Sequence, residues 1–152
     1  MSQLPEQIKT LLQTNGGSEA AFTEALKLIL TTFNSETGTI HKLDTEQQLL
    51  HLTAQVGLPP FMLEVVKTIP VGKGIAGATA ARGEPVTMCN LQTDTSGIAK
   101  SGAKQTGVGG ALCVPIRTGD KITGTLGIGT QRPYEYTVEE TRLLEEIASI
   151  LV

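Results

Sequence analysis

Residues 111–130, ALCVPIRTGDKITGTLGIGT, decide the fold class of this chain. The turn residues Thr118-Gly119-Asp120 separate two strand-like runs, which predicts a β-hairpin. Side chains alternate between the two faces of a strand, so the hairpin has two unlike faces. One face is bulky, apolar and suited to packing against helices: Leu112, Val114, Ile116, Ile122, Leu126 and Ile128. The other consists almost wholly of small side chains: Ala111, Cys113, Pro115, Thr123, Thr125, Gly127 and Gly129.

The small face of the hairpin predicts a pocket. A core face with so little side-chain volume either lets a helix approach very closely or leaves a cavity, and cavities that persist in natural proteins are usually occupied. Residues 92–110 form a long polar stretch, which is typical of a functional or mobile connection and would cover the pocket as a lid. We therefore expect a small molecule between the small face and this lid.

The predicted ligand contacts come from the lid and from the small face. They are Thr93, Asp94, Ser96, Lys100, Ser101, Lys104, Cys113, Thr125 and Gly127. The two lysines suit an anionic ligand, such as a carboxylate, nitrate or a nucleotide phosphate. For the lid residues the alternative is a solvated loop without a ligand. His41 could also point at the small face from a neighbouring strand, although a lone histidine in a strand is more often partnered or solvated.

The rest of the chain predicts helices at both ends with hairpins between them, which indicates an α+β fold. Apolar residues at helical spacing mark residues 4–12, 22–33 and 143–151. The last of these helices begins at Thr137-Val138-Glu139-Glu140, a capping box. The strand patterns are residues 37–44, 49–56, 67–71 and 86–91, and short helices are expected over residues 60–66 and 75–82.

The segment Gly72-Lys73-Gly74-Ile75-Ala76-Gly77 matches G-x-G-x-x-G, the spacing of a dinucleotide-binding loop. Three features favour another interpretation. Pro70 would remove a ladder hydrogen bond from the central strand that such a fold requires. The helix that follows ends by Gly83-Glu84-Pro85 and is too short to cross over a parallel sheet. The remaining strands form hairpins and do not alternate with helices.

The order and spacing of several motifs resemble a GAF domain over nearly the whole chain. They follow a hairpin that ends at Gly57 and are Ile69-Pro70-Val71-Gly72-Lys73-Gly74-Ile75-Ala76-Gly77, Gly83-Glu84-Pro85-Val86, Val114-Pro115-Ile116 and Gly124-Thr125-Leu126-Gly127-Ile128. The resemblance implies one α+β domain over residues 1–152, GAF-like and similar in outline to profilin and PAS domains. Its central antiparallel sheet would have five or six strands, with the terminal helices on one face and short helices and a ligand pocket on the other. The glycine loop would let a short helix lie close to the sheet.

Some GAF proteins are free methionine-R-sulfoxide reductases, which use cysteines together with acidic residues. Carried over by motif, these residues fall at Ala76, near Lys104, and at Ala111, Gly127 and Gly129, so this chain lacks them. Cys89 and Cys113 occupy none of these positions, and thiol catalysis requires a thiolate nucleophile with a resolving partner. We find no bilin-attaching cysteine, cyclic-nucleotide motif, metal spacing or context for a haem ligand. The sequence therefore predicts no enzymatic activity and identifies no cofactor.

Composition limits the partners. A net charge of −3 and 3% aromatic residues provide neither the basic stripe nor the stacking surface of a nucleic-acid-binding protein. No segment is long enough to span a membrane, and the N-terminus does not match a signal peptide. Two cysteines are too few for a disulfide scaffold and fit a reducing compartment, so we expect a cytoplasmic protein.

Together these features predict a small-molecule-binding sensor or regulatory domain of signal transduction that is not itself catalytic. Ligand binding would order the lid and bias the packing of the terminal helices toward an output domain or protein. The apolar residues of 4–12 and 143–151 predict a homodimer if one sheet cannot cover both helices. The alternative is a module for dimerisation or docking that binds no ligand, and a divergent enzyme is the third interpretation.

Overall fold

The computed structural model of the chain describes residues 4–15, 19–58, 60–88, 109–132 and 134–151. These residues form an α+β fold, as the sequence predicts. In chain order the elements are α1 (Leu4–Asn15), α2 (Glu19–Phe33), β1 (Thr37–Asp44), β2 (Leu49–Val56), α3 (Pro60–Val66), β3 (Thr68–Pro70), α4 (Gly74–Arg82), β4 (Val86–Met88), β5 (Ala111–Thr118), β6 (Lys121–Gly129) and α6 (Val138–Ile150).

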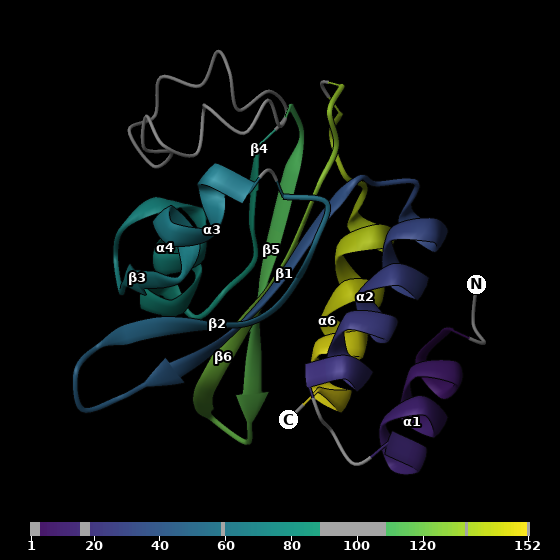
Figure 1. Cartoon of the computed structure of the whole chain (residues 1–152), viewed down its shortest axis with the longest axis horizontal. Coiled ribbons are helices and arrows are strands. Elements are labelled where there is room, and N and C mark those ends of the chain that lie inside the picture. Colours follow the sequence, from purple (N-terminus) through teal and green to yellow (C-terminus); the bar gives the residue numbers. More distant parts are fainter. Residues whose placement is uncertain (1–3, 16–18, 59, 89–108, 133, 152) are drawn as a thin grey trace.

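One antiparallel sheet forms the centre of the fold (Figure 1). Its six strands lie in the order β3-β2-β1-β6-β5-β4, so the hairpin β1–β2 and the hairpin β5–β6 meet where β1 pairs with β6. The prediction of five or six strands is therefore confirmed. Pro70 lies in β3, an edge strand, where a residue without a backbone N–H is tolerated.

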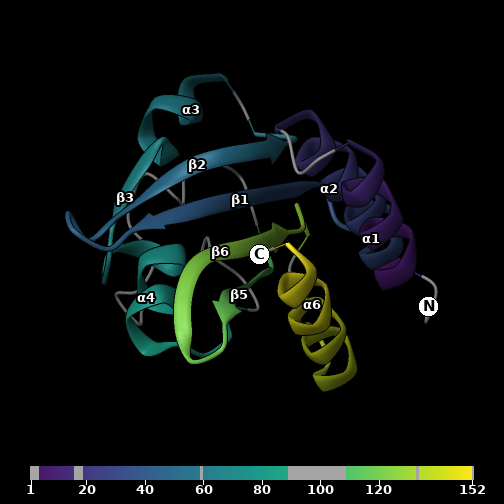
Figure 2. The same cartoon turned by 90° about the horizontal axis from the view of Figure 1, so that it is seen from below.

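The helices lie on opposite faces of the sheet. Helices α2 and α6 cover one face and α1 packs against them on the same side, whereas α3 and α4 lie on the other face (Figures 1 and 2). The predicted separation of the terminal helices from the short helices is thus confirmed. None of the described helices combines the length and the apolar character that crossing a bilayer requires.

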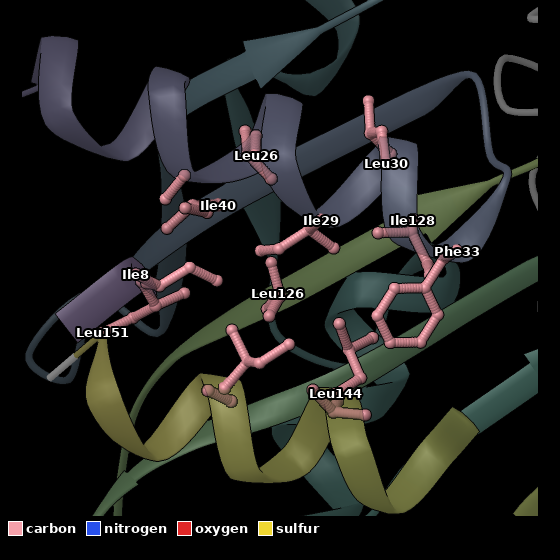
Figure 3. Close-up of a cluster of buried hydrophobic side chains, with 14 of the residues drawn as sticks. Ile8, Leu26, Ile29, Leu30, Phe33, Ile40, Leu126, Ile128, Leu144 and Leu151 are labelled. Carbon is pink, nitrogen blue, oxygen red and sulfur yellow. The ribbon is translucent and has the colours of Figure 1, made fainter. Parts of the chain in front are cut away.

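The main core lies between the sheet and the terminal helices. In Figure 3, Leu126 and Ile128 of β6 lie among side chains of α2 and α6, including Ile29 and Leu144. The predicted helical stripes are buried within this one chain through Leu4, Ile8, Leu144, Ile147, Ala148 and Leu151. The predicted homodimer required apolar helix residues that the chain leaves uncovered, and these residues are covered. The homodimer itself is not tested and stays a prediction.

One residue of the hairpin faces the other way from our expectation. The register of β5 and β6 shifts between Ile116 and Arg117, because Ile116 lies opposite Gly124 while Arg117 lies opposite Ile122. Thr123 is the extra residue of this β-bulge, and a bulge reverses the facing of the residues beyond it. The Ile122 side chain accordingly lies near Gly83 at the end of α4 and is not part of the helix-side core. The prediction that Ile122 lies on the bulky face is therefore wrong.

Helix α6 begins with the predicted capping box. The backbone N–H of Glu140 donates to Thr137 Oγ1 at 3.1 Å, and the backbone N–H of Thr137 donates to Glu140 Oε1 at 2.9 Å. The Tyr134 hydroxyl also donates to Glu140 Oε1, at 2.7 Å. The start of this helix is therefore fixed by its own first turn and by the segment that leads into it.

Candidate functional site

The glycine loop brings α4 onto the small face of the sheet. Gly72 and Gly74 have φ values of +91° and +65°, a backbone conformation that favours glycine. Two backbone hydrogen bonds close the loop. The Gly72 N–H donates to the Gly77 carbonyl at 2.8 Å, and the Lys73 N–H donates to the Pro70 carbonyl at 3.0 Å. A Cβ at Gly77 would lie 2.5 Å from that Pro70 oxygen. These glycines thus allow a tight turn and let α4 lie close to the backbone of β3, as predicted.

Helix α4 covers the middle of the small face. Gly77, Ala78 and Thr79 are its buried residues, and Cys113 and Thr125 of the sheet are buried as well. A face of small residues allows a helix to lie over it, and here α4 does so with Thr79 beside Cys113.

The same face is not covered along its whole length. Thr39 of β1 lies opposite Gly127 of β6, two residues along the strand from Thr125. Thr39 and Gly127 are both partly exposed. Residues 92–108 of the predicted lid lie outside the described residues.

Cys113 carries a thiol that stays protonated at neutral pH. Burial raises its pKa to about 11, and the Thr79 and Thr125 hydroxyls beside it oppose this effect only in part. A thiol in this state behaves as a small apolar side chain and not as a nucleophile. Cys89, the other cysteine of the chain, lies outside the described residues.

His41 lies on the same face and uses only one of its two ring nitrogens. Its side chain is 2% exposed, and Nε2 lies 2.9 Å from the carbonyl oxygen of Val66, the last residue of α3. Burial lowers the pKa of His41, the bond to Val66 opposes this effect, and the charge of His51 adds to it. The ring is therefore neutral at pH 7. Nδ1 is buried and has no hydrogen-bond partner.

Thr125 places a second unpartnered atom next to His41. Thr125 lies directly opposite His41 in the β1–β6 pairing, so the two side chains are neighbours on one face. The Thr125 side chain is 1% exposed, and its Oγ1 has no hydrogen-bond partner. The Cys113 thiol lies beside it, but a thiol is a weak hydrogen-bonding group and the contact lacks hydrogen-bond geometry.

The two unpartnered atoms are costly. A buried polar atom without a partner destabilises a folded protein by about 1–3 kcal/mol. Native structures contain few such atoms, and each one calls for a bound water, an ion, a ligand or another explanation. His41 Nδ1 and Thr125 Oγ1 are the two such side-chain atoms among the described residues. Their position side by side makes this point of the sheet the candidate site.

The predicted site residues fall into two groups. Cys113, Thr125 and Gly127 lie on the α4 face of the sheet, as predicted. The predicted lid contacts lie outside the described residues: Thr93, Asp94, Ser96, Lys100, Ser101 and Lys104. His41 could point at the small face according to the sequence, but it was not among the predicted site residues. Its register with Thr125 is the signal that could have placed it there, but this register depends on pairing between strands far apart in the chain.

In the described part of the chain, no three side chains of His, Cys, Asp or Glu lie together in a way that could hold a metal ion. The polar groups of the candidate site are an imidazole nitrogen and a hydroxyl, which suit hydrogen bonding to a small molecule.

Several solved structures have the same fold over almost the whole chain. The GAF domain of a phosphoenolpyruvate-protein phosphotransferase from Coxiella burnetii has a TM-score of 0.85 and 19% identity, covering 99% of this chain and 89% of that one. Free methionine-R-sulfoxide reductase from Neisseria meningitidis, in complex with its substrate, has a TM-score of 0.80 and 18% identity, covering 99% and 84%. The corresponding enzyme of Staphylococcus aureus with substrate has a TM-score of 0.77 and 21% identity, covering 99% and 92%.

These structures correct one expectation from the sequence. We expected a domain that is not an enzyme, yet free methionine-R-sulfoxide reductases from several organisms share this fold. The expectation is therefore overturned: an enzymatic role is compatible with the fold. At 14–21% identity the likeness shows the fold alone and does not assign the reductase activity to this chain.

The sequence comparison identifies the family. No curated protein matches the chain significantly in sequence. The family model of the GAF domain matches residues 17–152, which span α2 through α6 and include the whole sheet. With this match, the resemblance seen in the glycine loop and the hairpin motifs is confirmed, and the chain belongs to the GAF domain family.

Proposed function

We propose that this GAF domain binds a small polar molecule on the α4 face of its sheet and acts as a regulatory domain that responds to that molecule. The observation that carries the proposal is that two buried atoms without partners, His41 Nδ1 and Thr125 Oγ1, belong to residues that lie opposite each other in the β1–β6 pairing. A polar molecule bound between them would satisfy both. The binding part of the proposal is the same for an effector and for a substrate, whereas the regulatory part requires an effector.

Two similar proteins support a small-molecule site in this fold. The reductases of N. meningitidis and S. aureus were each solved with their substrate. The similar GAF domain of C. burnetii comes from a phosphotransferase, so the same fold also occurs as one domain of a larger protein.

The sheet offers a direct route from the site to the terminal helices. Ile40 precedes His41, and Leu126 follows Thr125; because side chains alternate along a strand, these two neighbours point to the other face. Both belong to the core against α1, α2 and α6. A ligand that shifts β1 or β6 would therefore act on the packing of these helices, within the limit set by its difference in affinity for the two arrangements.

The test is a search for ligands with the full chain. The purified protein is extracted and analysed by mass spectrometry for a co-purified molecule, and it is screened against small metabolites by thermal denaturation. A specific ligand at a hundred times its dissociation constant is expected to add about 2.7 kcal/mol to the free energy of unfolding. A domain that serves only in dimerisation or docking would show neither a co-purified molecule nor stabilisation by any compound.

A further inference from the structure

We infer that the ligand of this site presents a neutral hydrogen-bond donor, such as an amide N–H or a hydroxyl O–H, to His41 Nδ1 and also forms a hydrogen bond with the Thr125 hydroxyl. This inference rests on the proposed function and adds the chemical class of the ligand to it. It follows from which hydrogen bonds the two side chains can donate and which they can accept.

The tautomer of His41 makes Nδ1 an acceptor. Nε2 lies 2.9 Å from the Val66 carbonyl oxygen, and a carbonyl oxygen only accepts hydrogen bonds. Nε2 therefore carries the proton and donates it to Val66. In a neutral ring the other nitrogen then has a lone pair and no proton. The group that binds Nδ1 has to be a donor.

The Thr125 hydroxyl complements this acceptor. A hydroxyl can donate one hydrogen bond and accept others. Thr125 lies directly opposite His41, so one ligand group can reach both side chains. A primary amide or an alcohol fits because it can donate to Nδ1 and accept from the Thr125 hydroxyl. A carboxylate or phosphate oxygen has no proton to donate and would face the Nδ1 lone pair.

The surroundings disfavour a charged group at this point. His41 and Thr125 are nearly fully buried, and a buried charge is costly unless it is paired. The contacts that the described residues form between acidic and basic side chains lie elsewhere, at exposed or partly exposed positions: Lys27–Glu24, His51–Asp44 and Arg132–Glu36. An anionic ligand, which the lid lysines suggested, would have to place its charge away from these two atoms.

Acetamide and acetate are matched probes for this inference. They have nearly the same shape, but acetamide has neutral N–H donors whereas acetate has only anionic acceptors. The full chain is labelled with ¹⁵N-histidine, and the ring nitrogens are followed by NMR while each probe is added at neutral pH. His51, which is exposed, is an internal control because the chain has two histidines.

The expected result is a saturable shift of the His41 Nδ1 resonance with acetamide and no such shift with acetate. The His51 resonances should stay unchanged with acetamide. Equal responses to both probes would overturn the inference. So would a His41 Nδ1 resonance that neither probe moves, because the two atoms would then be satisfied by a trapped water only.

Two substitutions test the same contacts independently. Thr125→Val removes the hydroxyl and keeps the shape, and His41→Gln removes the ring acceptor while its amide can still donate to Val66. Each is expected to weaken acetamide binding about tenfold, the value of one good hydrogen bond. Thr79→Val is the matched control, because the buried Thr79 hydroxyl already donates to the Ile75 carbonyl at 2.8 Å, and it should leave the affinity unchanged. If His41→Gln does not fold, the inference is tested by the acetamide affinity of Thr125→Val and by the ¹⁵N spectra of the unaltered chain.

The outcomes separate this inference from the proposed function. A metabolite that stabilises the domain but binds Thr125→Val and His41→Gln as tightly as the unaltered chain would refute the inference and leave the proposed function standing. If no metabolite stabilises the domain and acetamide does not bind, both are refuted.

Discussion

Gly77 of α4 packs against the carbonyl oxygen of Pro70 so closely that a Cβ on Gly77 would lie 2.5 Å from it. The same oxygen accepts the Lys73 N–H, and the Gly77 carbonyl accepts the Gly72 N–H. The G-x-G-x-x-G spacing therefore belongs to a loop that folds back on its own strand. It places α4 against the sheet and over the candidate site.

Replacing Gly77 by alanine should test this close contact. The backbone of Pro70 cannot move away without disturbing the pairing of β3 with β2, so Gly77→Ala is expected to destabilise the protein by about 1–3 kcal/mol. Lys73→Ala, in the same loop, removes an exposed side chain that forms no helix cap and should change stability by less than about 0.5 kcal/mol. Urea denaturation measures both. Equal stability of the two variants would show that the loop adapts to a Cβ.

His41 should make the stability of the domain depend on pH. Burial lowers its pKa in the folded chain, whereas the unfolded chain keeps a value near 6.5. Unfolding therefore takes up a proton in this range, and the free energy of unfolding should fall as the pH falls below 6.5 toward the lower pKa of the folded state.

The control for this pH dependence is a pair of variants. His41→Gln should remove the part of the decline that His41 causes, measured by urea denaturation between about pH 7.5 and pH 5. His51→Gln, at an exposed position in β2, should retain most of it. A decline that is the same in His41→Gln as in the unaltered chain would contradict the assignment.

The fold was largely predictable from local patterns. The hairpin over residues 111–130, the capping box at Thr137 and Glu140 and the glycine loop each depend on a few consecutive residues, and each is found where it was predicted. The facing of Ile122 was not predictable, because the β-bulge at Thr123 is a property of the paired strands. Strict alternation from Leu126 back to Ile122 therefore assigned the wrong face.

The candidate site was predictable only in part. The place of Cys113, Thr125 and Gly127 on the α4 face was predictable because a run of small residues on one strand face is visible in the sequence, while their contact with a ligand stays a prediction. The role of His41 depends on the β1–β6 register and on the carbonyl of Val66, two long-range features that no local pattern contains. The approach of α4 over Cys113 was one of two outcomes that the small residues allowed, and side-chain volume alone could not choose between them.

Cys113 should resist alkylation in the native protein. Its thiol is buried, and with a pKa raised to about 11 the reactive thiolate is scarce at pH 8. We expect iodoacetamide to leave Cys113 unmodified in the folded chain and to modify it fully in urea, as measured at this site by mass spectrometry. Alkylation in the folded chain at the rate of the denatured chain would show that the α4 face opens readily.

The capping box should fix the start of α6. Thr137→Ala removes the acceptor of the Glu140 N–H and should destabilise the protein by about 1 kcal/mol. Thr32→Ala, at an exposed position in α2, is the matched control and should be neutral or slightly stabilising because alanine favours the helix. Thermal denaturation measures both. A Thr137→Ala protein as stable as the control would mean that the Tyr134–Glu140 bond suffices to hold this helix end.

The unpartnered hydroxyl of Thr125 should cost stability in the ligand-free protein, and removing it should restore that stability. Thr125→Val is therefore expected to raise the free energy of unfolding by about 1 kcal/mol, since valine fills the same space without a buried polar atom. Thr79 provides the contrast, because its equally buried hydroxyl donates to the Ile75 carbonyl, so Thr79→Val should be neutral or mildly destabilising. Urea denaturation of the three proteins without added ligand measures this. A Thr125→Val variant that is stabilised yet binds ligand more weakly would show a site that retains an unsatisfied group for binding. A Thr125→Val variant less stable than Thr79→Val would mean that the Thr125 hydroxyl has a partner within the chain, and the case for a ligand at this point would fail.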